Sequence, residues 1–184
     1  MRIIAGSKRG CAIAAPKGLD TRPTLDRVKE SLFGILQFEI GSKRVLDLFA
    51  GSGNLGLEAL SRGASFAFFC DASRTATRVV EANIQKLGFE NRSKVLNCSF
   101  EAAIAALARS GERVDIVFLD PPYASGLHEK ALLALRNSGI LAPGAILIAE
   151  HDPGRPPALP EGLTTYDQRR YGEVALSLIR EERP

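Results

Sequence analysis

Short apolar runs alternate with stretches of helical periodicity over most of the chain, from residue 45 onward. The apolar runs, each expected to form a strand, are residues 45–49, 66–70, 94–97, 114–119 and 145–149. Helices are expected between them, over about 54–62, 73–87, 100–108 and 127–137. Parallel strands need crossover connections, and helices usually provide them. The alternation therefore predicts an α/β fold with a parallel sheet covered by helices.

Two strand pairs are expected outside the alternating part. Residues 2–4 and 11–13 flank a turn that contains two glycines, which is typical of a β-hairpin. Residues 164–166 and 174–179 flank a second turn, and we expect them to pair in antiparallel fashion at an edge of the sheet.

A helix is expected between the first hairpin and the sheet, with Thr24 as its N-cap residue. Its apolar residues recur at helical spacing, at positions 25, 28, 32, 35 and 36. Arg27, Lys29 and Glu30 lie off this stripe. We therefore expect the helix to pack on the sheet and to leave these three charged side chains in solvent.

Positive charge is concentrated at the start of the chain. Residues 1–44 carry nine Lys and Arg against four Asp and Glu, whereas residues 45–184 carry fifteen against seventeen. Phosphate contacts require clustered positive charge, although a solvated basic surface remains an alternative. We expect residues 1–44 to form a nucleic-acid-facing appendage and residues 45–184 to form the catalytic domain. The candidate phosphate contacts are Lys8, Arg9, Arg22 and Arg27.

Composition excludes several other classes of protein. No apolar run approaches the roughly 20 residues that span a bilayer, and the first residues lack a signal-peptide core, so we expect a cytoplasmic protein without membrane contact. The three cysteines, Cys11, Cys70 and Cys98, are far apart and form no C-x-x-C pair. With only two histidines, neither a disulfide framework nor a metal site is indicated.

The strongest candidate for chemistry is Asp120-Pro121-Pro122-Tyr123, at the end of the apolar run 114–119. Ligands bind at the carboxyl ends of the strands in open α/β sheets. Neither proline has an N–H, so the backbone offers acceptors only. Asp120 and the Pro121 carbonyl suit both hydrogens of an exocyclic amino group on a planar base, and Tyr123 suits stacking on its ring. A simple strand followed by a turn is the alternative.

A glycine-rich loop follows the first strand. Gly51-Ser52-Gly53-Asn54-Leu55-Gly56 matches the dinucleotide-binding pattern, and Asp71 stands about 20 residues further on, where a ribose-binding acid belongs. A dehydrogenase is therefore a rival interpretation. Against it stands Asp47, because a carboxylate near this loop would repel a pyrophosphate. Asp47 and Asp120 together favour S-adenosylmethionine, whose amino acid end and sulfonium are cationic.

These residues carry a family resemblance. The segment 45–53 (VLDLFAGSG) followed by Asp-Pro-Pro-Tyr resembles class I S-adenosylmethionine-dependent methyltransferases that modify exocyclic amines. The segments 2–6 (RIIAG), 22–33 (RPTLDRVKESLF) and 56–63 (GLEALSRG) make the chain similar to the RsmD-type 16S ribosomal RNA guanine-N2 methyltransferases. The resemblance implies a Rossmann-like, seven-stranded, mostly parallel sheet with an antiparallel last strand. It also implies methyl transfer to the N2 amine of one guanine in small-subunit RNA.

The resemblance also implies roles for individual residues. Those at the methionine end of the cofactor would be Asp47, Phe49, Gly51 and Gly53, with Asp71 at the ribose. Ser99 and Phe100 would flank the adenine. An Asp or Asn commonly stands in the family where this chain has Ser99, which leaves the backbone N–H of Phe100 to contact the adenine. Arg22 and Thr24 would lie near the mouth of the site.

Other substrates remain open at this level. The same amine chemistry would serve DNA adenine, transfer RNA or a protein glutamine, although the chain has no separate target-recognition domain. A nucleotide-binding RNA chaperone without catalysis is an alternative from another class, and the intact Asp120-to-Tyr123 motif argues against it. Because so short a chain has little surface for sequence readout, we expect a monomer that uses the 16S RNA or the small subunit itself for specificity.

Overall fold

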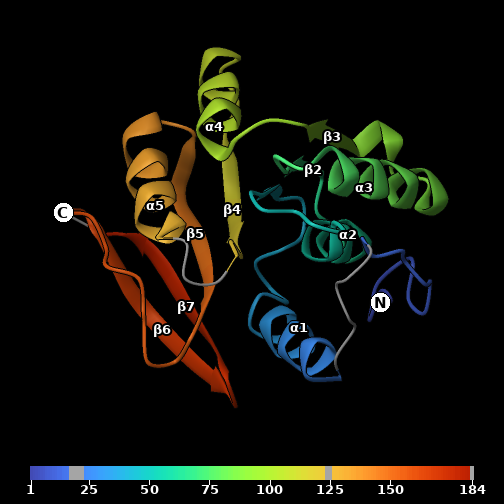
Figure 1. The fold of residues 1–184 in the computed structure, drawn as a ribbon, viewed down its shortest axis with the longest axis horizontal. Helices are drawn as coiled ribbons and strands as arrows, with labels where there is room; N and C mark the ends of the chain where they lie inside the picture. The colour runs from blue at the N-terminus through green and yellow to red at the C-terminus, as the bar shows by residue number, and fades with distance from the viewer. Residues whose placement is uncertain (17–22, 123–125, 183–184) are drawn as a thin grey trace.

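The computed structural model describes residues 1–16, 23–122 and 126–182 (Figure 1). Arg22 and Tyr123 lie outside the described residues. The helices are α1 (Pro23–Ile35), α2 (Asn54–Ser61), α3 (Arg74–Leu87), α4 (Phe100–Arg109) and α5 (Leu127–Ser138), with a 3-10 turn, η1 (Glu90–Arg92). The strands are β1 (Arg44–Asp47), β2 (Phe66–Cys70), β3 (Ser93–Leu96), β4 (Val114–Leu119), β5 (Leu141–His151), β6 (Leu163–Tyr171) and β7 (Val174–Glu181).

The strands form one seven-stranded sheet in the order β3-β2-β1-β4-β5-β7-β6. Neighbours from β3 to β5 pair in parallel, and β7 pairs antiparallel with both β5 and β6. Six strands thus point the same way and only the last is reversed. This confirms the predicted α/β fold and the antiparallel pair at the edge. The carboxyl ends of β1, β2, β4, β5 and β6 consequently share one edge of the sheet.

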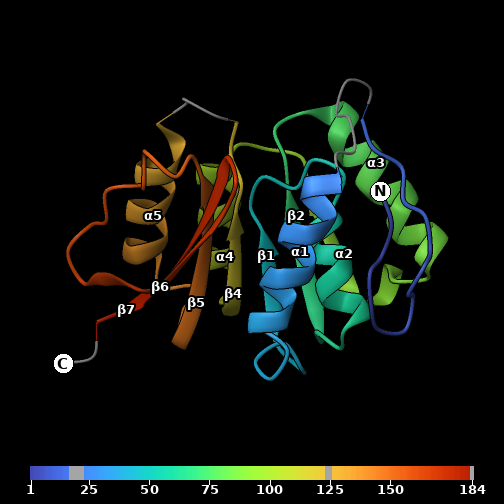
Figure 2. The same ribbon diagram turned by 90° about the horizontal axis from the view of Figure 1, so that it is seen from below.

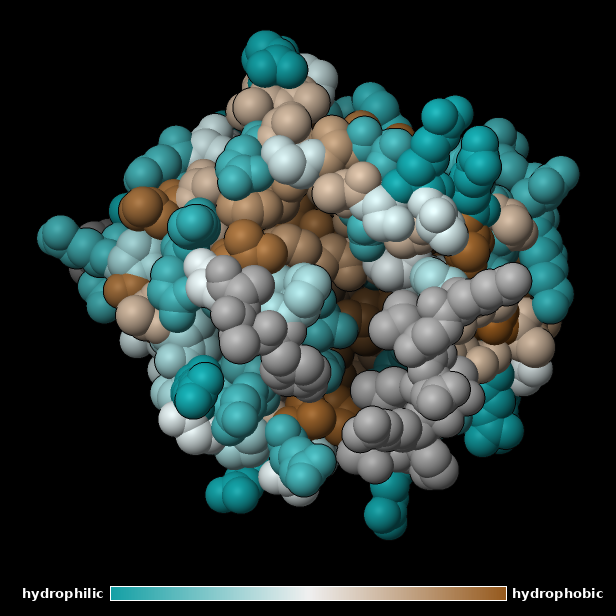
Figure 3. All heavy atoms as spheres, in the orientation of Figure 1, coloured by the Kyte–Doolittle hydropathy of each residue, from teal (hydrophilic) through white to brown (hydrophobic). Residues whose placement is uncertain are grey.

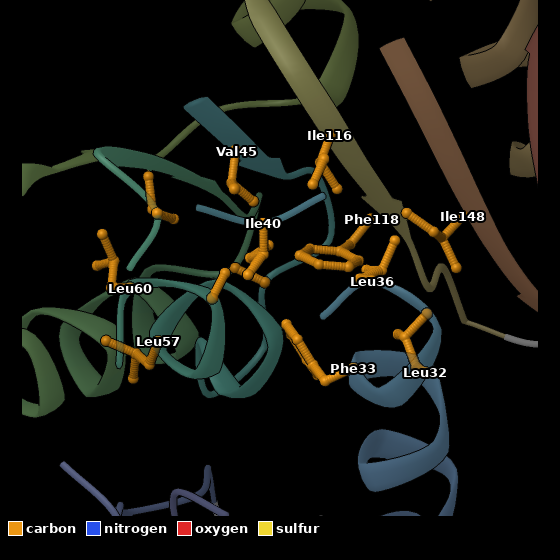
Figure 4. Packing of buried hydrophobic residues seen from close by; sticks show 14 of the residues in the cluster. Leu32, Phe33, Leu36, Ile40, Val45, Leu57, Leu60, Ile116, Phe118 and Ile148 are labelled. Carbon is orange, nitrogen blue, oxygen red and sulfur yellow. The ribbon is translucent and has the colours of Figure 1, made fainter. Parts of the chain in front are cut away.

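Helices cover both faces of the sheet (Figure 2). One apolar cluster joins α1, α2 and α3 to one face, and a second joins α4 and α5 to the other. In Figure 4, Phe33 of α1 lies against Phe118 of β4, and the centroids of their rings are 5.7 Å apart. Among the described residues, no helix combines the length and the apolar character needed to cross a membrane.

The N-terminal hairpin is held by side chains of the helices more than by its own strands. Its ladder is a single bridge between Arg2 and Ala12, which is shorter than the two predicted strands. Ile3 and Ile13 are buried in the same cluster as α1, α2 and α3. Residues 1–16 therefore pack directly on the sheet's helical layer. The division into units at residue 44 stays a sequence-based prediction.

The expectation that Lys29 faces solvent is wrong. Its side chain is 2% exposed, and its Nζ lies 3.2 Å from a carboxylate oxygen of Glu58. The same Nζ donates to the Arg2 carbonyl at 2.6 Å and to Asn54 Oδ1 at 2.8 Å. Burial becomes possible because these three oxygens replace the water that a buried ammonium loses.

The start of α1 also differs from the prediction. The helix begins at Pro23, so Thr24 lies within its first turn and does not precede it. Proline is favoured at the first helical position because its missing N–H has no helical partner there and its φ is already helical. The remaining two charged residues of the predicted solvent face, Arg27 and Glu30, are exposed as expected.

Candidate functional site

Three aspartates follow neighbouring strands at the shared carboxyl edge. Asp47 ends β1, Asp71 follows β2 and Asp120 follows β4, and these strands are adjacent in the order β2-β1-β4. Side chains alternate between the faces of a strand. Continuing that alternation from Phe69 and Phe118, which pack toward α1 to α3, puts Asp71 and Asp120 on the same face as Asp47. The predicted site residues from three separate motifs thus meet at one edge and on one face.

Asp47 is buried, with 3% of the residue exposed. Its Oδ2 accepts a hydrogen bond from the backbone N–H of Gly56 at 3.0 Å, near the start of α2. Burial raises the pKa of Asp47 to about 7, the Gly56 N–H opposes the rise, and the charges of Asp120 and Asp71 add to it. A buried carboxylate whose charged neighbours are also acids is an environment that a cationic ligand would stabilise.

Asp71 organises the loop that follows β1. Its Oδ2 accepts from the Gly51 N–H at 2.9 Å, and its Oδ1 accepts from the Ser73 N–H at 2.8 Å. Ser73 in turn caps α3, because its hydroxyl accepts from the Ala76 N–H at 3.3 Å. Asp71 therefore links the glycine loop to the start of α3, and its carboxylate lies where the ends of both segments meet.

The glycines of the loop are required by its geometry. Gly51 and Gly53 have φ angles of 55° and 79°, which favour glycine. A Cβ on Gly53 would approach Leu57, Phe69 and Val80 at 3.3 Å, whereas a Cβ on Gly51 would meet no atom within 4 Å. The loop is therefore tightly packed on one side and open at Gly51. An open backbone at this place lets a ligand approach closely.

Phe49, Ser99 and Phe100 lie together beside this loop. The rings of Phe49 and Phe100 are 5.7 Å apart, with Phe49 half-buried and Phe100 buried. Ser99 is the N-cap of α4, because its hydroxyl accepts from the Ala102 N–H at 3.3 Å. Ser99, which stands where the resembling family commonly has Asp or Asn, thus caps α4 here. The aromatic pair supplies an apolar surface suited to a planar base.

Asp120 and the two prolines end β4. Asp120 is exposed and Pro121 is buried, with Pro122 exposed beside it. Crowding by protein atoms raises the pKa of Asp120 to about 6, although solvent that reaches the carboxylate screens part of this effect. Asp120 is therefore an accessible acceptor, and Asp47 lies close enough to feel its charge.

The face that carries this edge is hollowed near its middle, where β4 ends in Figure 1, and apolar side chains are visible in the hollow (Figure 3). The buried Asp47 with its raised pKa, an open glycine backbone and an aromatic pair match the parts of S-adenosylmethionine. Asp47 suits its cationic end, and the rings suit its adenine. Within the described part of the chain, no three metal-ligating side chains gather to form a metal site.

Three of the predicted phosphate contacts are described: Lys8 and Arg9 belong to the hairpin, and Arg27 belongs to α1. Arg9 and Arg27 are exposed and line a hollow of about 610 Å³ between these two elements. Lys8 is half-buried, and its Nζ lies 5.7 Å from the centre of the Phe89 ring. The structure thus brings Arg9 and Arg27 together, while Lys8 turns back onto the protein.

Asn83 is a residue that the sequence pattern did not single out. The residue is 1% exposed, and its Oδ1 accepts from the Ala14 N–H at 2.8 Å. Its Nδ2 donates to the carbonyls of Ala14 and Ser52, at 2.9 and 3.0 Å. Asn83 thus connects the segment after the hairpin to the glycine loop. The sequence does place an asparagine on the apolar stripe of α3. Because a buried amide needs hydrogen-bond partners, this position could have indicated a contact with another segment.

The geometry can be compared with known proteins. A family model described as conserved hypothetical protein 95 matches residues 1–180. Ribosomal RNA small subunit methyltransferase D of Escherichia coli (strain K12) is 37% identical over 183 residues, covering 99% of this chain and 90% of that protein. Hypothetical protein TTHA0928 of Thermus thermophilus has a similar structure, with a TM-score of 0.81 and 32% identity, covering 97% of this chain and 98% of that chain.

A more distant structure shows the same fold. SMU.776, solved in complex with SAH, matches with a TM-score of 0.70 and 14% identity, over 86% of this chain and 50% of that chain. At this identity the likeness concerns the fold alone. The family model and the Escherichia coli relative both extend along nearly the whole sequence. The chain therefore belongs to the conserved hypothetical protein 95 family, the family of the RsmD-type methyltransferases.

Proposed function

We propose that the protein transfers a methyl group from S-adenosylmethionine to the exocyclic N2 amine of a guanine in 16S ribosomal RNA. The proposal draws on the name of the Escherichia coli relative, a ribosomal RNA small subunit methyltransferase. The observation that carries it is Asp120 with Pro121 and Pro122 at the carboxyl edge, beside the buried Asp47. Acceptors without backbone donors at this edge suit an amino group.

The cofactor pocket consists of the residues from β1, β2 and the start of α4. Asp47 and the backbone at Gly51 and Gly53 hold the methionine end, where carboxylate charge favours the ammonium and the sulfonium. Asp71 accepts hydrogen bonds from the ribose hydroxyls and retains its hydrogen bond from the Gly51 N–H. Phe49 and Phe100 contact the adenine. S-adenosylmethionine supplies the methyl group, and SMU.776, which shares the fold, was solved with SAH.

Asp120 and the Pro121 carbonyl act on the target base. The lone pair of a guanine N2 amine is delocalised into the ring, so the amine is a poor nucleophile. Two acceptors for its hydrogens orient the amine and stabilise the positive charge that develops on nitrogen during transfer. The base leaves its stack to reach this edge, and Tyr123 replaces the lost stacking. Positioning of the two reactants supplies the rest of the rate enhancement.

RNA contacts are made by the basic N-terminal part. Arg9 and Arg27 line the same hollow, and Lys8 and Arg22 belong to the same stretch of positive charge. The exposed guanidinium groups of Arg9 and Arg27 contact phosphates, which fix the position of the RNA without reading its sequence. Specificity then comes from the shape of the ribosomal RNA, and a monomer suffices for it.

The test offers labelled S-adenosylmethionine with four acceptors in parallel. They are small ribosomal subunits that lack the modification, free ribosomal RNA, transfer RNA and duplex DNA. The methylated nucleoside is then identified. We expect N2-methylguanosine from a ribosomal acceptor. Label on an exocyclic amine of DNA or transfer RNA would overturn the proposed substrate while leaving methyl transfer to an amine in place. Label at another position of the guanine base would overturn transfer to the amine itself.

A further inference from the structure

A second hollow lies between α1 and the turn that joins β6 to β7. Its volume is about 540 Å³, and it is lined by Arg27, Glu30, Ser31, Tyr171 and Gly172. This volume falls within the range of about 300–1,000 Å³ that is usual for small-ligand sites. In Figure 1 the turn at the end of β6 reaches toward α1, and a hydrogen bond between the hydroxyls of Ser31 and Tyr171 connects the two elements.

The walls of this hollow follow from the periodicity of both elements. Arg27, Glu30 and Ser31 are three and four residues apart, so they share one face of α1. Tyr171 is the last residue of β6 and packs partly on the apolar cluster beneath α1. Its hydroxyl is fixed by Ser31, which holds the aromatic side chain in place at the wall of the hollow.

Tyr171 shares its edge and its face of the sheet with Asp120. β6 runs in the same direction as β4, and both side chains lie on the side of the sheet that α1 covers. The register across β5 and β7 puts Leu119 level with Gln168. Asp120 is one residue beyond that level and Tyr171 is three. Three strand spacings and two residues separate them, which is about 16 Å in a flat sheet.

That separation matches a short length of RNA. Stacked nucleotides in one strand rise about 3.4 Å each, and an unstacked strand reaches further, so about 16 Å corresponds to roughly two to five nucleotides. An RNA that places its target base at Asp120 would therefore bring a nearby nucleotide to Tyr171. The polar groups present are suited to it, since Glu30 can accept from a base edge and Arg27 can donate to a phosphate.

Cationic groups also surround this hollow. Arg27 and Glu30 line both this hollow and the one between the hairpin and α1, so the two hollows are neighbours along α1. Arg170 is exposed beside the turn, where its Nε donates to the Gly172 carbonyl at 3.2 Å. A strand of RNA that crosses α1 thus meets guanidinium groups on both sides of the helix. Among the described residues that line the two hollows, Tyr171 is the only aromatic one.

We propose that the hollow between α1 and the β6–β7 turn binds an unpaired nucleotide of the RNA substrate, with its base stacked on Tyr171. This inference rests on the proposed function and adds the C-terminal strand pair to the RNA-binding surface. Stacking on an aromatic side chain suits an unpaired base because every base has a π-face. The contact holds the RNA a few nucleotides from the methylated base.

The test compares Tyr171→Ala with Tyr166→Ala. Tyr166 is also a tyrosine of β6, but it lies toward the other end of the strand, where Arg180 covers its ring at 3.5 Å. Binding of unmodified small ribosomal subunits is measured directly, and methyl transfer is measured separately. We expect Tyr171→Ala to weaken subunit binding about 5- to 150-fold, the scale of one lost base–aromatic stack. The matched variant should bind as the unaltered protein does.

Further readouts separate stacking from a structural role. Tyr171→Phe, which keeps the ring and loses only the bond to Ser31, should retain most of the affinity. The affinity for S-adenosylmethionine and kcat at saturating subunits should be unchanged in Tyr171→Ala. Equal binding by the two alanine variants, or a loss of kcat without a loss of binding, would overturn the proposal. Subunit binding without methyl transfer by the unaltered protein would instead refute the proposed function.

Discussion

Charged side chains occur in two contrasting settings in this protein. Beneath the N-terminal hairpin, Glu58 is fully buried, yet its carboxylate accepts from the N–H groups of Ile4 and Ala5 and pairs with Lys29 and Arg62. At the carboxyl edge of the sheet, Asp47 is buried beside other acids. Glu58 has four donors around its carboxylate, whereas Asp47 is buried with one backbone donor, Gly56, and two acidic neighbours.

The difference distinguishes a structural charge, Glu58, from the charge that we propose binds the cofactor, Asp47. A buried charge with all its partners in place contributes to a defined fold, and removal of one partner leaves the others uncompensated. A carboxylate among acids costs stability in the free protein and is stabilised when a cation arrives. The following variants test this contrast.

Glu58→Ala should have the largest effect. It leaves the buried Lys29 ammonium and two backbone N–H groups without their partner, and we expect a loss of about 3–5 kcal/mol in the free energy of unfolding. Urea denaturation measures the loss. The double variant Lys29→Met/Glu58→Ala also removes the buried ammonium that Glu58→Ala leaves without its carboxylate. Its free energy of unfolding should therefore fall less than that of Glu58→Ala alone. A cost below about 1 kcal/mol for Glu58→Ala would show that the network does little for the fold.

Asp120→Ala should reduce methyl transfer by about 100-fold or more, the scale for one group that stabilises developing charge. Binding of S-adenosylmethionine and the melting temperature should change little. Asp115→Ala is a matched control on the same strand, since Asp115 pairs with Lys43 at the opposite end of β4. Equal rates for the two variants in a single-turnover assay would contradict the role given to Asp120.

Gly6→Ala tests how closely the hairpin packs on α2. Gly6 and Gly10 both have φ of 83°, but a Cβ on Gly6 would lie 1.9 Å from the Ser61 carbonyl oxygen, while a Cβ on Gly10 meets nothing within 4 Å. Gly10→Ala should therefore carry only the backbone cost of roughly 1 kcal/mol. Gly6→Ala should cost at least about 2 kcal/mol more. Similar melting temperatures for both would show that the hairpin can move away from α2.

Asp47→Asn should stabilise the ligand-free protein at high pH. Because the pKa of Asp47 is raised to about 7, protonation favours the folded state, and this contribution is complete below about pH 4 and lost as the pH rises through 7. An asparagine side chain does not ionise, so the variant keeps its folding stability as the pH rises through 7. We expect a melting temperature about 2–4 °C higher than that of the unaltered protein at pH 8, corresponding to roughly 1 kcal/mol, and no gain at about pH 4.

The same substitution should weaken binding of S-adenosylmethionine, because the ammonium and sulfonium lose a carboxylate. Differential scanning fluorimetry and a binding titration on the same samples give both quantities. A lower melting temperature at pH 8 together with unchanged cofactor affinity would place Asp47 in the same structural class as Glu58.

The edge of the sheet was predictable from sequence because local rules determine it. Alternating apolar runs fix the strands, and each motif follows its strand directly, so Asp47, Asp71 and Asp120 had to share an edge once the sheet was parallel. The family resemblance and the fold are confirmed. The strand limits were less accurate, since β1 ends at Asp47 and β5 begins at Leu141, four residues earlier than expected.

The environment of the hairpin was not predictable in the same way. Lys29 was assigned to solvent because its own helix gives no sign of the acid that it meets, and Glu58 belongs to another helix 29 residues away. Asn83 likewise contacts Ala14, which lies 69 residues earlier. Such pairings depend on how separate elements dock, and a helical pattern carries information about one element at a time.

The hairpin also has a consequence for synthesis of the chain. Residues 1–14 are made before the side chains that hold them, which belong to α1, α2 and α3. The most distant of these is Lys86, which donates to the Ala12 carbonyl at 2.6 Å. At about 5–20 residues per second, residue 86 is added roughly 4–17 seconds after residue 1. During that interval residues 1–14, which carry Arg2, Lys8 and Arg9, lack the later side chains that hold them, so their positive charge is not yet packed against the rest of the protein.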